Sequence, residues 1–371
     1  MKIGFDAKWY FDGPPSGRRV VRGMIGGLAR LAQDDEVHLF LDARRESEWE
    51  SIDIPRAQQH YVWAGNNQLS NLWNVPRAAD DAGMDVVAYQ NFVPPRLRAR
   101  HARIAFVHDV IFDEHPHFFT TAERLYFSTV RPLARSADRV CTVSASEKAR
   151  IARRGFAAEA QIDVVPHGID DRFQSKPGSS DADELTKLGV QCPYVLYVGR
   201  LTRRKNVSTL VRAMAHVSLK PLSLVIVGAS DATDASLPAL ARELGLADRI
   251  RFLGPIYDDR LATLYRNASA FCFPTWDESY GLPPLEAMAC GTPCVVSDLP
   301  VLREMYGDAA LFADPNDETS FARAIDELVQ RSDDCAALRE RGQTRAASFT
   351  WQRAAELLLA SARAAVESRR T

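Results

Sequence analysis

The sequence lacks a long uncharged apolar run and an excess of charge of one sign. No apolar stretch approaches the roughly 18–20 residues that a membrane-spanning helix needs, and the first residues carry no apolar signal block. Lys and Arg number 46 against 48 Asp and Glu, so the formal net charge is -2 and no polycationic field is expected to attract nucleic acid. These absences predict a cytoplasmic protein without a nucleic-acid partner.

Cysteine is scarce, and the dinucleotide-binding pattern Gly-x-Gly-x-x-Gly follows none of the expected strands. The missing glycine pattern argues against an NAD-linked oxidoreductase. The cysteines form no Cys-x-x-Cys pair and have no histidine at zinc-finger spacing, so we expect reduced core thiols rather than metal or redox ligands. They are Cys141, Cys192, Cys272, Cys290, Cys294 and Cys335.

The chain does have the length and apolar content for two domains, with 371 residues of which 46% are apolar and 25% charged. Short β-rich runs alternate with longer helical stretches, which is typical of parallel sheets covered by helices. The sequence therefore predicts an α/β protein with two doubly wound, Rossmann-like domains. Strands are expected at 2–6, 37–41, 60–63, 85–90, 104–107, 140–143 and 163–165, and again at 194–198, 222–227, 250–253, 270–273, 294–297 and 310–313.

A polar stretch at 174–181, rich in helix and strand breakers, separates the two halves. We expect an N-terminal domain at 1–172, a linker at 173–186, a C-terminal domain at 187–350 and a closing helix at 351–371. Apolar residues at helical spacing after Trp351, with Thr350 as the N-cap, predict that helix.

A cluster of cations follows the first expected strand of the second half. Gly199 and Arg200 come directly after the strand, Lys205 closes the cluster, and a helix is expected at 207–217. A glycine turn that brings backbone N–H groups and side-chain charge to the start of a helix suits a phosphate-bearing ligand. A solvated turn is the alternative when the cluster is taken alone.

Two glutamates follow the expected strand at 270–273. Glu278 lies in the loop, and Glu286 lies in the first turns of a helix that Pro283 begins and that runs to Cys290. At the carboxyl end of a sheet, one carboxylate is placed to bind hydroxyls deep in a pocket while the other faces the reacting group. Taken alone, the presence of Glu286 at this position can be explained by the helix macrodipole, which favours an acidic residue in a first turn by roughly 0.3–1 kcal/mol.

Together these residues resemble the C-terminal half of a family-4 retaining glycosyltransferase of the GT-B fold, and the resemblance spans nearly the whole chain. It implies two Rossmann-like domains that face each other across a cleft, with the last helix crossing back to the N-terminal domain. It also implies that Arg200 and Lys205 hold the diphosphate of a sugar nucleotide, that Glu278 meets the transferred sugar and that Glu286 binds ribose hydroxyls. The ordered set is Gly199-Arg200, Lys205, Glu278-x7-Glu286 and Gly291-Thr292-Pro293.

The same resemblance implies further donor-binding residues. The turn at 254–257, with Ile256 and Tyr257, is similar to the segment that receives the nucleobase. Gly199 belongs to the diphosphate turn, and the donor cradle is completed by Tyr280, Gly281 and Leu282.

The first half resembles the family more loosely. His108 follows a strand in a His-Asp pair, the family's usual place for a histidine beside the donor sugar, and is expected to orient that sugar. Ser144 is expected to be a helix N-cap rather than a nucleophile. His167 stands where the family usually has asparagine and receives no role. The turn at 13–17 precedes the first helix, and Gly17 and Arg18 are candidate contacts to donor or acceptor.

The resemblance implies a retaining, metal-independent hexosyltransferase, in which Arg200 and Lys205 neutralise the leaving diphosphate without a divalent ion. We expect mannose to be transferred from GDP-mannose, with α-linkage, to a glycan or lipid-linked saccharide in the synthesis of a bacterial surface polysaccharide such as lipopolysaccharide. A rhamnosyl- or glucosyltransferase that uses a dTDP- or UDP-sugar is the alternative. An epimerase or phosphorylase of the same fold is another rival, and an inactive scaffold subunit that binds sugar nucleotides is the rival from a different class.

Two charged clusters remain. The segment Asp181-Ala182-Asp183 matches the metal-binding motif Asp-x-Asp. It lies in the expected linker with no strand before it, so no metal role is expected. The other cluster forms a solvated loop or, alternatively, a site for an anionic lipid surface or a lipid diphosphate, which would place the protein peripherally at the inner face of the membrane. It comprises Arg96, Arg98, Arg100, His101 and Arg103.

Overall fold

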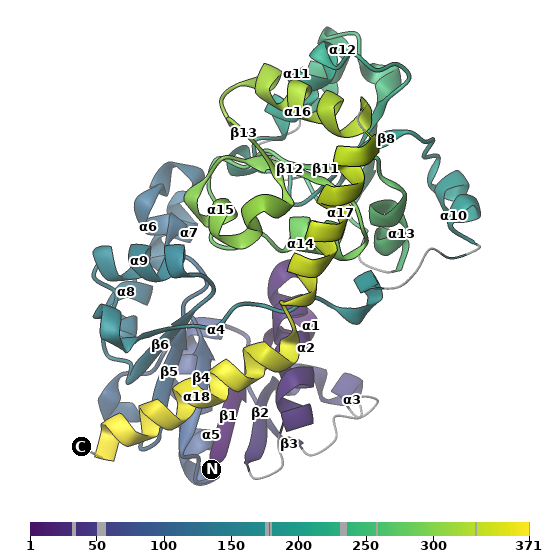
Figure 1. Ribbon diagram of the computed structural model, residues 1–371. Coiled ribbons are helices and arrows are strands. Elements are labelled where there is room, and N and C mark those ends of the chain that lie inside the picture. The colour runs from purple at the N-terminus through teal and green to yellow at the C-terminus, as the bar shows by residue number, and fades with distance from the viewer. Residues whose placement is uncertain are drawn as a thin grey trace. The chain divides into compact units, whose positions relative to one another are not determined.

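The computed structural model describes residues 1–31, 35–49, 57–174, 178, 180–230, 236–256, 259–330 and 332–370. The chain divides into two compact units. Unit 1 comprises Met1–Gly168 and Phe349–Thr371, and unit 2 comprises Ile169–Ser348. Each unit contains one parallel sheet with helices packed against it (Figure 1).

Unit 1 is built on a seven-stranded parallel sheet in the order β3-β2-β1-β4-β5-β6-β7. The chain moves outward from β1 to β3 and then returns to the other side of β1 at β4, so ligands are expected at the carboxyl ends of β1 and β4. The strands are β1 (Lys2–Asp6), β2 (Glu36–Asp42), β3 (Ala57–Val62), β4 (Val86–Gln90), β5 (Ala102–Phe106), β6 (Arg139–Thr142) and β7 (Ile162–Val164).

The helices of unit 1 connect these strands and cover the sheet (Figure 1). They are α1 (Trp9–Asp12), α2 (Pro15–Leu31), α3 (Glu46–Trp49), α4 (Asn67–Leu69), α5 (Val75–Asp81), α6 (Ile111–Glu114), α7 (Thr121–Phe127), α8 (Val130–Ala134), α9 (Ala145–Arg153) and α18 (Trp351–Arg370).

Unit 2 is built on a six-stranded parallel sheet in the order β10-β9-β8-β11-β12-β13. Here the strand order reverses between β8 and β11. The strands are β8 (Tyr194–Val198), β9 (Ser223–Val227), β10 (Ile250–Gly254), β11 (Ala270–Phe273), β12 (Cys294–Ser297) and β13 (Leu311–Ala313). The helices are α10 (Asp181–Leu188), α11 (Val207–His216), α12 (Leu237–Glu243), α13 (Asp259–Asn267), α14 (Leu282–Ala289), α15 (Pro300–Tyr306), α16 (Glu318–Gln330) and α17 (Ser332–Ala347).

The prediction of two Rossmann-like α/β domains is confirmed. Central strands such as β4, β5 and β8 are buried along their whole length, because helices cover both faces of a parallel sheet. The sequence of β8 is apolar throughout, whereas β4 ends in Gln90 and β5 includes Arg103. The strand β3 begins three residues before the predicted 60–63, since this edge strand carries polar Gln58 and Gln59 where the prediction relied on apolar residues.

The closing helix α18 belongs to unit 1, as predicted. Its N-cap is Thr350, whose hydroxyl accepts a hydrogen bond from the backbone N–H of Arg353 at 3.1 Å. The helix packs against α2 and the strands β4, β5 and β6. The two helices approach so closely that a Cβ added at Gly23 would lie 2.0 Å from the Trp351 ring, and one at Gly27 would lie 2.3 Å from the Trp351 carbonyl oxygen.

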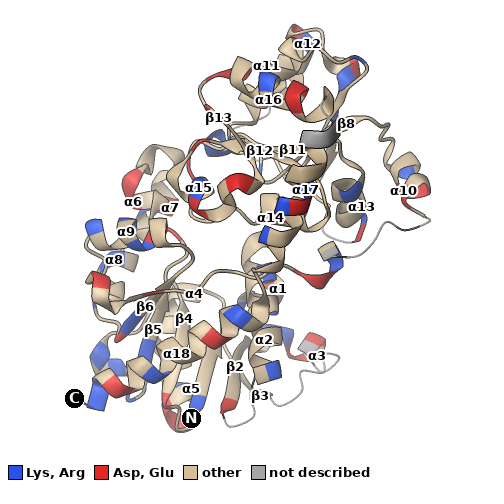
Figure 2. Cartoon of the chain, in the orientation of Figure 1, with Lys and Arg blue, Asp and Glu red and all other residues tan. Residues whose placement is uncertain are grey.

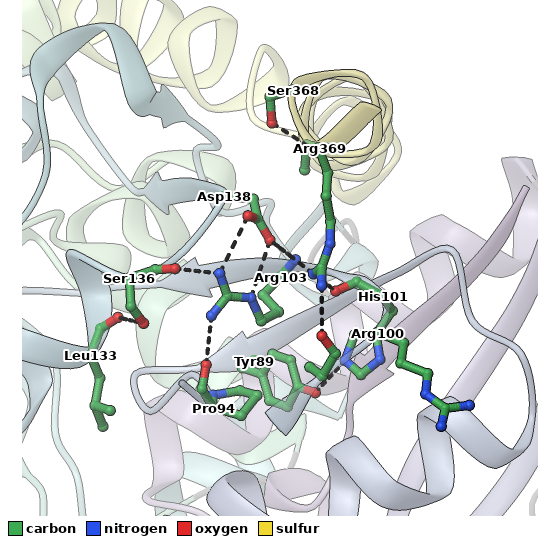
Figure 3. A network of polar contacts seen from close by, with 12 residues as sticks. Tyr89, Pro94, Arg100, His101, Arg103, Leu133, Ser136, Asp138, Ser368 and Arg369 are labelled. Atoms are coloured by element: carbon green, nitrogen blue, oxygen red, sulfur yellow. Dashed lines mark hydrogen bonds and ion pairs between the residues drawn. The ribbon is translucent and has the colours of Figure 1, made fainter. Parts of the chain in front are cut away.

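The end of α18 is held by a buried polar network (Figure 3). Arg369 donates to the backbone carbonyls of Ala99, at 2.6 Å, and His101, and its guanidinium lies 3.6 Å from Asp138. Asp138 also pairs with Arg103, whose side chain is fully buried and donates to the Pro94 carbonyl at 2.8 Å.

This network corrects the prediction for the arginine cluster. Arg103 pairs inside the unit, and the buried His101 bonds to Asp80 and to the hydroxyl of Tyr89, both at 2.7 Å, so neither residue belongs to a cationic surface. The remaining arginines of the cluster, Arg96, Arg98 and Arg100, are exposed, which agrees with both a solvated loop and a site for an anionic lipid surface.

The predicted linker also needs correction, because 173–186 lies within unit 2 and its second half is helical. Asp181 opens α10 and is buried, with Oδ1 2.8 Å from the guanidinium of Arg266 and Oδ2 accepting a hydrogen bond from Asn267 at 3.1 Å. The hydrogen bond from Arg266 lowers the pKa of this carboxyl, although burial opposes the shift. The carboxylate is thus a structural anchor for α13.

Surface charge is mixed in both units, with basic and acidic segments interspersed on the helices (Figure 2). Among the residues that the structure describes, no helix has both the length and the apolar character needed to span a membrane. All of the cysteines are free thiols, but the prediction that they are core residues is wrong for Cys192, which is exposed, and holds only partly for the half-buried Cys290.

Candidate active site

The two loops that carry the predicted donor-binding residues follow neighbouring strands of unit 2. Residues 199–206 follow β8 and residues 274–281 follow β11, and the strand order reverses between these two strands. The carboxyl ends of strands at such a reversal are where open α/β sheets bind ligands. The fold therefore brings the two sequence segments to one place in the sheet.

The first loop approaches the neighbouring loop after β9. A Cβ added at Gly228 would lie 1.8 Å from the carbonyl oxygen of Gly199, so the backbones touch at this point. The hydroxyl of Tyr197 donates to the carbonyl of Arg200 at 3.1 Å and holds the turn, while the Arg200 side chain is exposed. The turn therefore fixes the backbone of Arg200 and leaves its guanidinium accessible to a ligand.

Asn206 fastens the two loops together. It is buried with a left-handed φ of 54°, and its amide nitrogen donates to the carbonyls of Pro274, at 2.9 Å, and Pro315, at 2.8 Å. The backbone N–H of Trp276 donates to the carbonyl of Arg204 at 2.9 Å, which makes a second link between the loops. The helix α11 begins at the next residue, Val207, as predicted.

Lys205 and Glu278 form an ion pair across these loops. The guanidinium of Arg204 lies 3.5 Å from the same carboxylate oxygen and donates to the carbonyl of Asp277. The ammonium group of Lys205 also lies 4.7 Å from the centre of the Phe273 ring, at the end of β11. The structure thus brings together two predicted site residues that are far apart in the sequence.

The electrostatics of this pair keep Glu278 ionised. Burial alone would raise the pKa of its carboxyl, but the charges of Lys205 and Arg204 outweigh burial and lower the pKa to about 2. The site therefore holds two cations around one carboxylate at neutral pH.

Glu286 is buried within α14, and its carboxylate accepts a hydrogen bond from the hydroxyl of Tyr265 at 3.0 Å. It is the fifth residue of the helix, beyond the first turn, so the macrodipole explanation for an acid at this position does not apply. Pro283 occupies the first turn as predicted, and the helix ends at Ala289 with Cys290 as its C-cap.

The start of α14 is fixed by Gly281, which has a left-handed φ of 93° and accepts a hydrogen bond from the Tyr306 hydroxyl at 2.6 Å. A Cβ there would lie 2.3 Å from that hydroxyl oxygen, so only glycine fits. Tyr280 and Leu282 on either side are buried. Ile256, from the predicted nucleobase segment, is also buried, whereas Tyr257 lies outside the described residues.

The predicted histidine of unit 1, His108, is partly exposed just after β5. Its ring stacks on Phe106 with centroids 4.7 Å apart and lies 5.9 Å from Trp9. Burial lowers the pKa of His108 to about 4, so the imidazole is neutral at pH 7. His167 packs 5.6 Å from His108, and burial holds the pKa of His167 well below its usual value.

Two further predictions fall in unit 1. Ser144 caps α9 by accepting a hydrogen bond from the backbone N–H of Glu147 at 3.0 Å, which confirms its structural role. The turn predicted at 13–17 is shorter than expected, because α2 begins at Pro15 and therefore contains Gly17 and Arg18 in its first turns. Pro at the first helical position favours this earlier start.

Each of the two units matches a family model of known glycosyltransferases. Residues 185–345 match the family model described as "Glycosyl transferases group 1", and residues 17–173 match the one described as "Glycosyltransferase Family 4". The chain belongs to the GT-B glycosyltransferases. The two matches fall on unit 2 and unit 1 respectively and leave only short segments unmatched.

Curated glycosyltransferases resemble part of this chain. The "D-inositol 3-phosphate glycosyltransferase" of Corynebacterium jeikeium (strain K411) is 37% identical over 218 residues, which cover 54% of this chain and 51% of the relative. The protein of the same name from Mycolicibacterium smegmatis is 35% identical over 234 residues, covering 61% and 52%. The matched region thus spans about half the length of these relatives.

Solved glycosyltransferase structures share the fold over nearly the whole chain. Anabaena Alr3699/HepE in complex with UDP and glucose has a TM-score of 0.76 and 20% identity, covering 97% of this chain and 98% of that one. WaaG, a glycosyltransferase involved in lipopolysaccharide biosynthesis, has a TM-score of 0.72 and 18% identity, with the same coverage.

Three residues at these sites had no assigned role in the sequence analysis. Arg204 contacts Glu278, Asn206 fastens the loops, and Gln90 in unit 1 lies 2.7 Å from His108. A signal existed for each: Arg204 lies in the cation cluster, Asn206 is an amide at a helix start, and Gln90 is a polar residue ending an apolar strand. Within the described parts of the chain, no group of three or more His, Cys, Asp or Glu side chains is arranged to hold a metal ion.

Proposed function

We propose that this chain transfers a hexose from a nucleotide sugar to a saccharide or lipid-linked saccharide acceptor, with α-linkage, retention of configuration and no requirement for a metal ion. The observation that carries the proposal is the convergence of Lys205 and Arg204 on Glu278 at the strand-order reversal of unit 2. Departure of a diphosphate leaves negative charge that fixed cations stabilise. Lys205 and the exposed Arg200 are the groups we assign to that task, with Glu278 facing the sugar and Glu286 the ribose.

For the donor we propose GDP-mannose, with dTDP-rhamnose and UDP-glucose as alternatives. A thermal-shift panel of GDP, UDP, dTDP and ADP tests this assignment, since a ligand at 100 times its Kd stabilises the folded state by about 2.7 kcal/mol. The largest shift is expected with GDP. A larger shift with UDP or dTDP would replace the proposed donor while leaving the proposed chemistry in place.

For the acceptor we propose a saccharide of surface-polysaccharide assembly. The curated relatives are named for D-inositol 3-phosphate, so that compound belongs in the acceptor panel. Release of nucleoside diphosphate that depends on an added acceptor is the expected result. Turnover without an acceptor would indicate an epimerase, a requirement for free phosphate would indicate a phosphorylase, and nucleotide binding with no release under any condition would indicate an inactive scaffold subunit.

We also propose that the protein is cytoplasmic and contacts the inner face of the membrane through a lipid-facing patch, defined as Trp73, Arg96, Leu97, Arg98 and Arg100. Leu97 is 101% exposed and Trp73 is 49% exposed, and the guanidinium of Arg98 lies 3.1 Å from the centre of the Trp73 ring. An aromatic ring, an exposed leucine and three cations suit the interface of an anionic bilayer.

A further inference from the structure

Gln90 lies at the carboxyl end of β4, next to the strand-order reversal of unit 1, and its side chain contacts the predicted site residue His108. The residue is 1% exposed. Its amide nitrogen donates to the backbone carbonyl of Asp6 at 3.4 Å, and its amide oxygen lies 2.7 Å from Nε2 of His108.

These two contacts determine which groups donate. A backbone carbonyl only accepts, so the amide nitrogen of Gln90 must face Asp6 and the amide oxygen must face His108. An amide oxygen also only accepts, so the proton of the neutral imidazole has to reside on Nε2.

Asp6, to which Gln90 is tied, is itself held in a buried cluster. Its carboxylate accepts from the ammonium of Lys8, from the amide of Asn71 at 2.8 Å and from the backbone N–H of Gln90 at 3.3 Å. Lys8 also donates to Asn71, and all of these residues are buried. Gln90 therefore has a fixed support and little freedom to rotate its amide.

The other ring nitrogen of His108 is Nδ1. No hydrogen bond joins Nδ1 to any residue in the described ranges, and the ring is partly exposed between its contacts with Phe106 and Trp9. In the Nε2–H tautomer, Nδ1 presents a lone pair and accepts a hydrogen bond.

We propose that Gln90 is a positioning residue that locks His108 in the Nε2–H tautomer, so that Nδ1 accepts a hydrogen bond from a hydroxyl of the substrate. The ligand group must carry a proton to give, so a hydroxyl fits and a carboxylate or phosphate oxygen does not. The assignment of that hydroxyl to a nucleotide sugar rests on the proposed function, whereas the tautomer does not.

The tautomer is tested by nitrogen-15 NMR of the full chain labelled at histidine, with His108 assigned from the signals lost in His108→Phe. At pH 7 we expect a protonated Nε2 and an unprotonated Nδ1. In Gln90→Leu the two nitrogens should move toward averaged signals as both tautomers become populated. If Gln90→Leu does not fold, Gln90→Met, which keeps the side-chain length, takes its place.

The matched control is Gln68→Leu, which removes another glutamine of unit 1 whose amide donates to Thr129 at 2.7 Å. It should leave the His108 signals unchanged. A proton on Nδ1 in the natural protein, or identical His108 signals in the Gln90 variants, would overturn the proposal. Because this measurement requires no turnover, the tautomer assignment is tested independently of the proposed reaction.

The role of Nδ1 is tested with donor sugars that lack one hydroxyl each. In the natural protein, kcat/KM should fall by about tenfold for one of these analogues, the loss expected when one hydrogen bond is removed. In Gln90→Leu the natural donor should lose most of that advantage while the analogue is barely affected. Equal losses for donor and analogue would contradict the proposal and indicate a merely structural role.

Discussion

In the proposed reaction, Lys205 is assigned the positive charge that stabilises the leaving diphosphate. Removing one preorganised group of this kind costs roughly 2.7–4 kcal/mol of activation free energy, so Lys205→Ala should lower kcat about 100- to 1,000-fold at saturating donor. The control is Lys187→Ala, which removes an exposed lysine paired with Glu184 on α10 and should leave kcat unchanged. Near-normal turnover in folded Lys205→Ala would refute the assignment.

Glu278 neutralises part of the charge of Lys205 and Arg204 in the ligand-free site. In Glu278→Gln these cations become more available to a diphosphate, so nucleotide affinity should be maintained or increased while sugar transfer is lost. Calorimetric titration with nucleoside diphosphate measures the affinity, and product release measures transfer. A collapse of nucleotide affinity would mean that the roles of Glu278 and Glu286 are assigned the wrong way round.

The pKa of His108 makes stability depend on pH in a definite window. The unfolded chain takes up a proton at the ordinary histidine pKa of about 6.5, whereas the folded chain does so only near pH 4, so stability should fall as the pH drops from about 6.5 toward 4. This group contributes up to about 1.4 kcal/mol per pH unit in that range. His108→Phe should therefore flatten this part of a plot of unfolding temperature against pH, and an unchanged slope would contradict the assigned cause.

Sequence reasoning could single out Lys205 and Glu278 as candidate site residues, but it could not show that they pair. Lys205 and Glu278 each stood out in their own loops, yet their ion pair depends on β8 and β11 being neighbours in the sheet, which strand patterns alone do not specify. Gln90 was missed because a polar residue at the end of an apolar strand is a signal that does not show which residues it contacts. Its importance comes from contacts with residues far away in the chain.

The contact between α2 and α18 depends on small residues. Gly27→Ala would place a Cβ within 2.3 Å of the Trp351 carbonyl oxygen and should destabilise unit 1 by about 1–3 kcal/mol, as overpacked sites do. Gly26→Ala is a matched control, because a Cβ there meets nothing within 4 Å, and alanine should stabilise the helix by roughly 0.5–1 kcal/mol. Thermal unfolding should therefore shift in opposite directions for adjacent glycines, and equal shifts would contradict this account.

Apolar runs decided how well the bounds of the buried strands were predicted. The strands β8 and β11 have the predicted bounds because uninterrupted apolar runs mark them, and β1 and β12 also have them although Lys2, Asp6 and Ser297 are polar. The strand β5 was predicted at 104–107 but spans Ala102–Phe106, because the polar Arg103 is buried within it. The start of α10 was missed for a physical reason: Asp181 is polar, but its ion pair with Arg266 buries it, and a sequence pattern cannot show a partner so far along the chain.

Charge on the molecule is balanced overall, so membrane contact has to come from a local patch rather than from net charge. Each arginine near an anionic surface contributes about 1 kcal/mol, so Arg98→Gln with Arg100→Gln should weaken binding to phosphatidylglycerol vesicles by roughly 30-fold. The charge-matched control is Arg212→Gln with Arg323→Gln, on α11 and α16 of unit 2. Cosedimentation measures binding, and equal binding by both double variants would exclude the patch.

The backbone of Gly168 touches the start of α18, since a Cβ there would lie 2.2 Å from the Trp351 nitrogen. The polypeptide thus leaves unit 1 and re-enters it at one point, with unit 2 inserted between. During synthesis on the ribosome, unit 2 is contiguous and has all its residues before unit 1 does. Unit 1 therefore cannot be completed at first. The surface of its sheet that α18 covers stays exposed until unit 2 has been translated and the closing helix has left the ribosome.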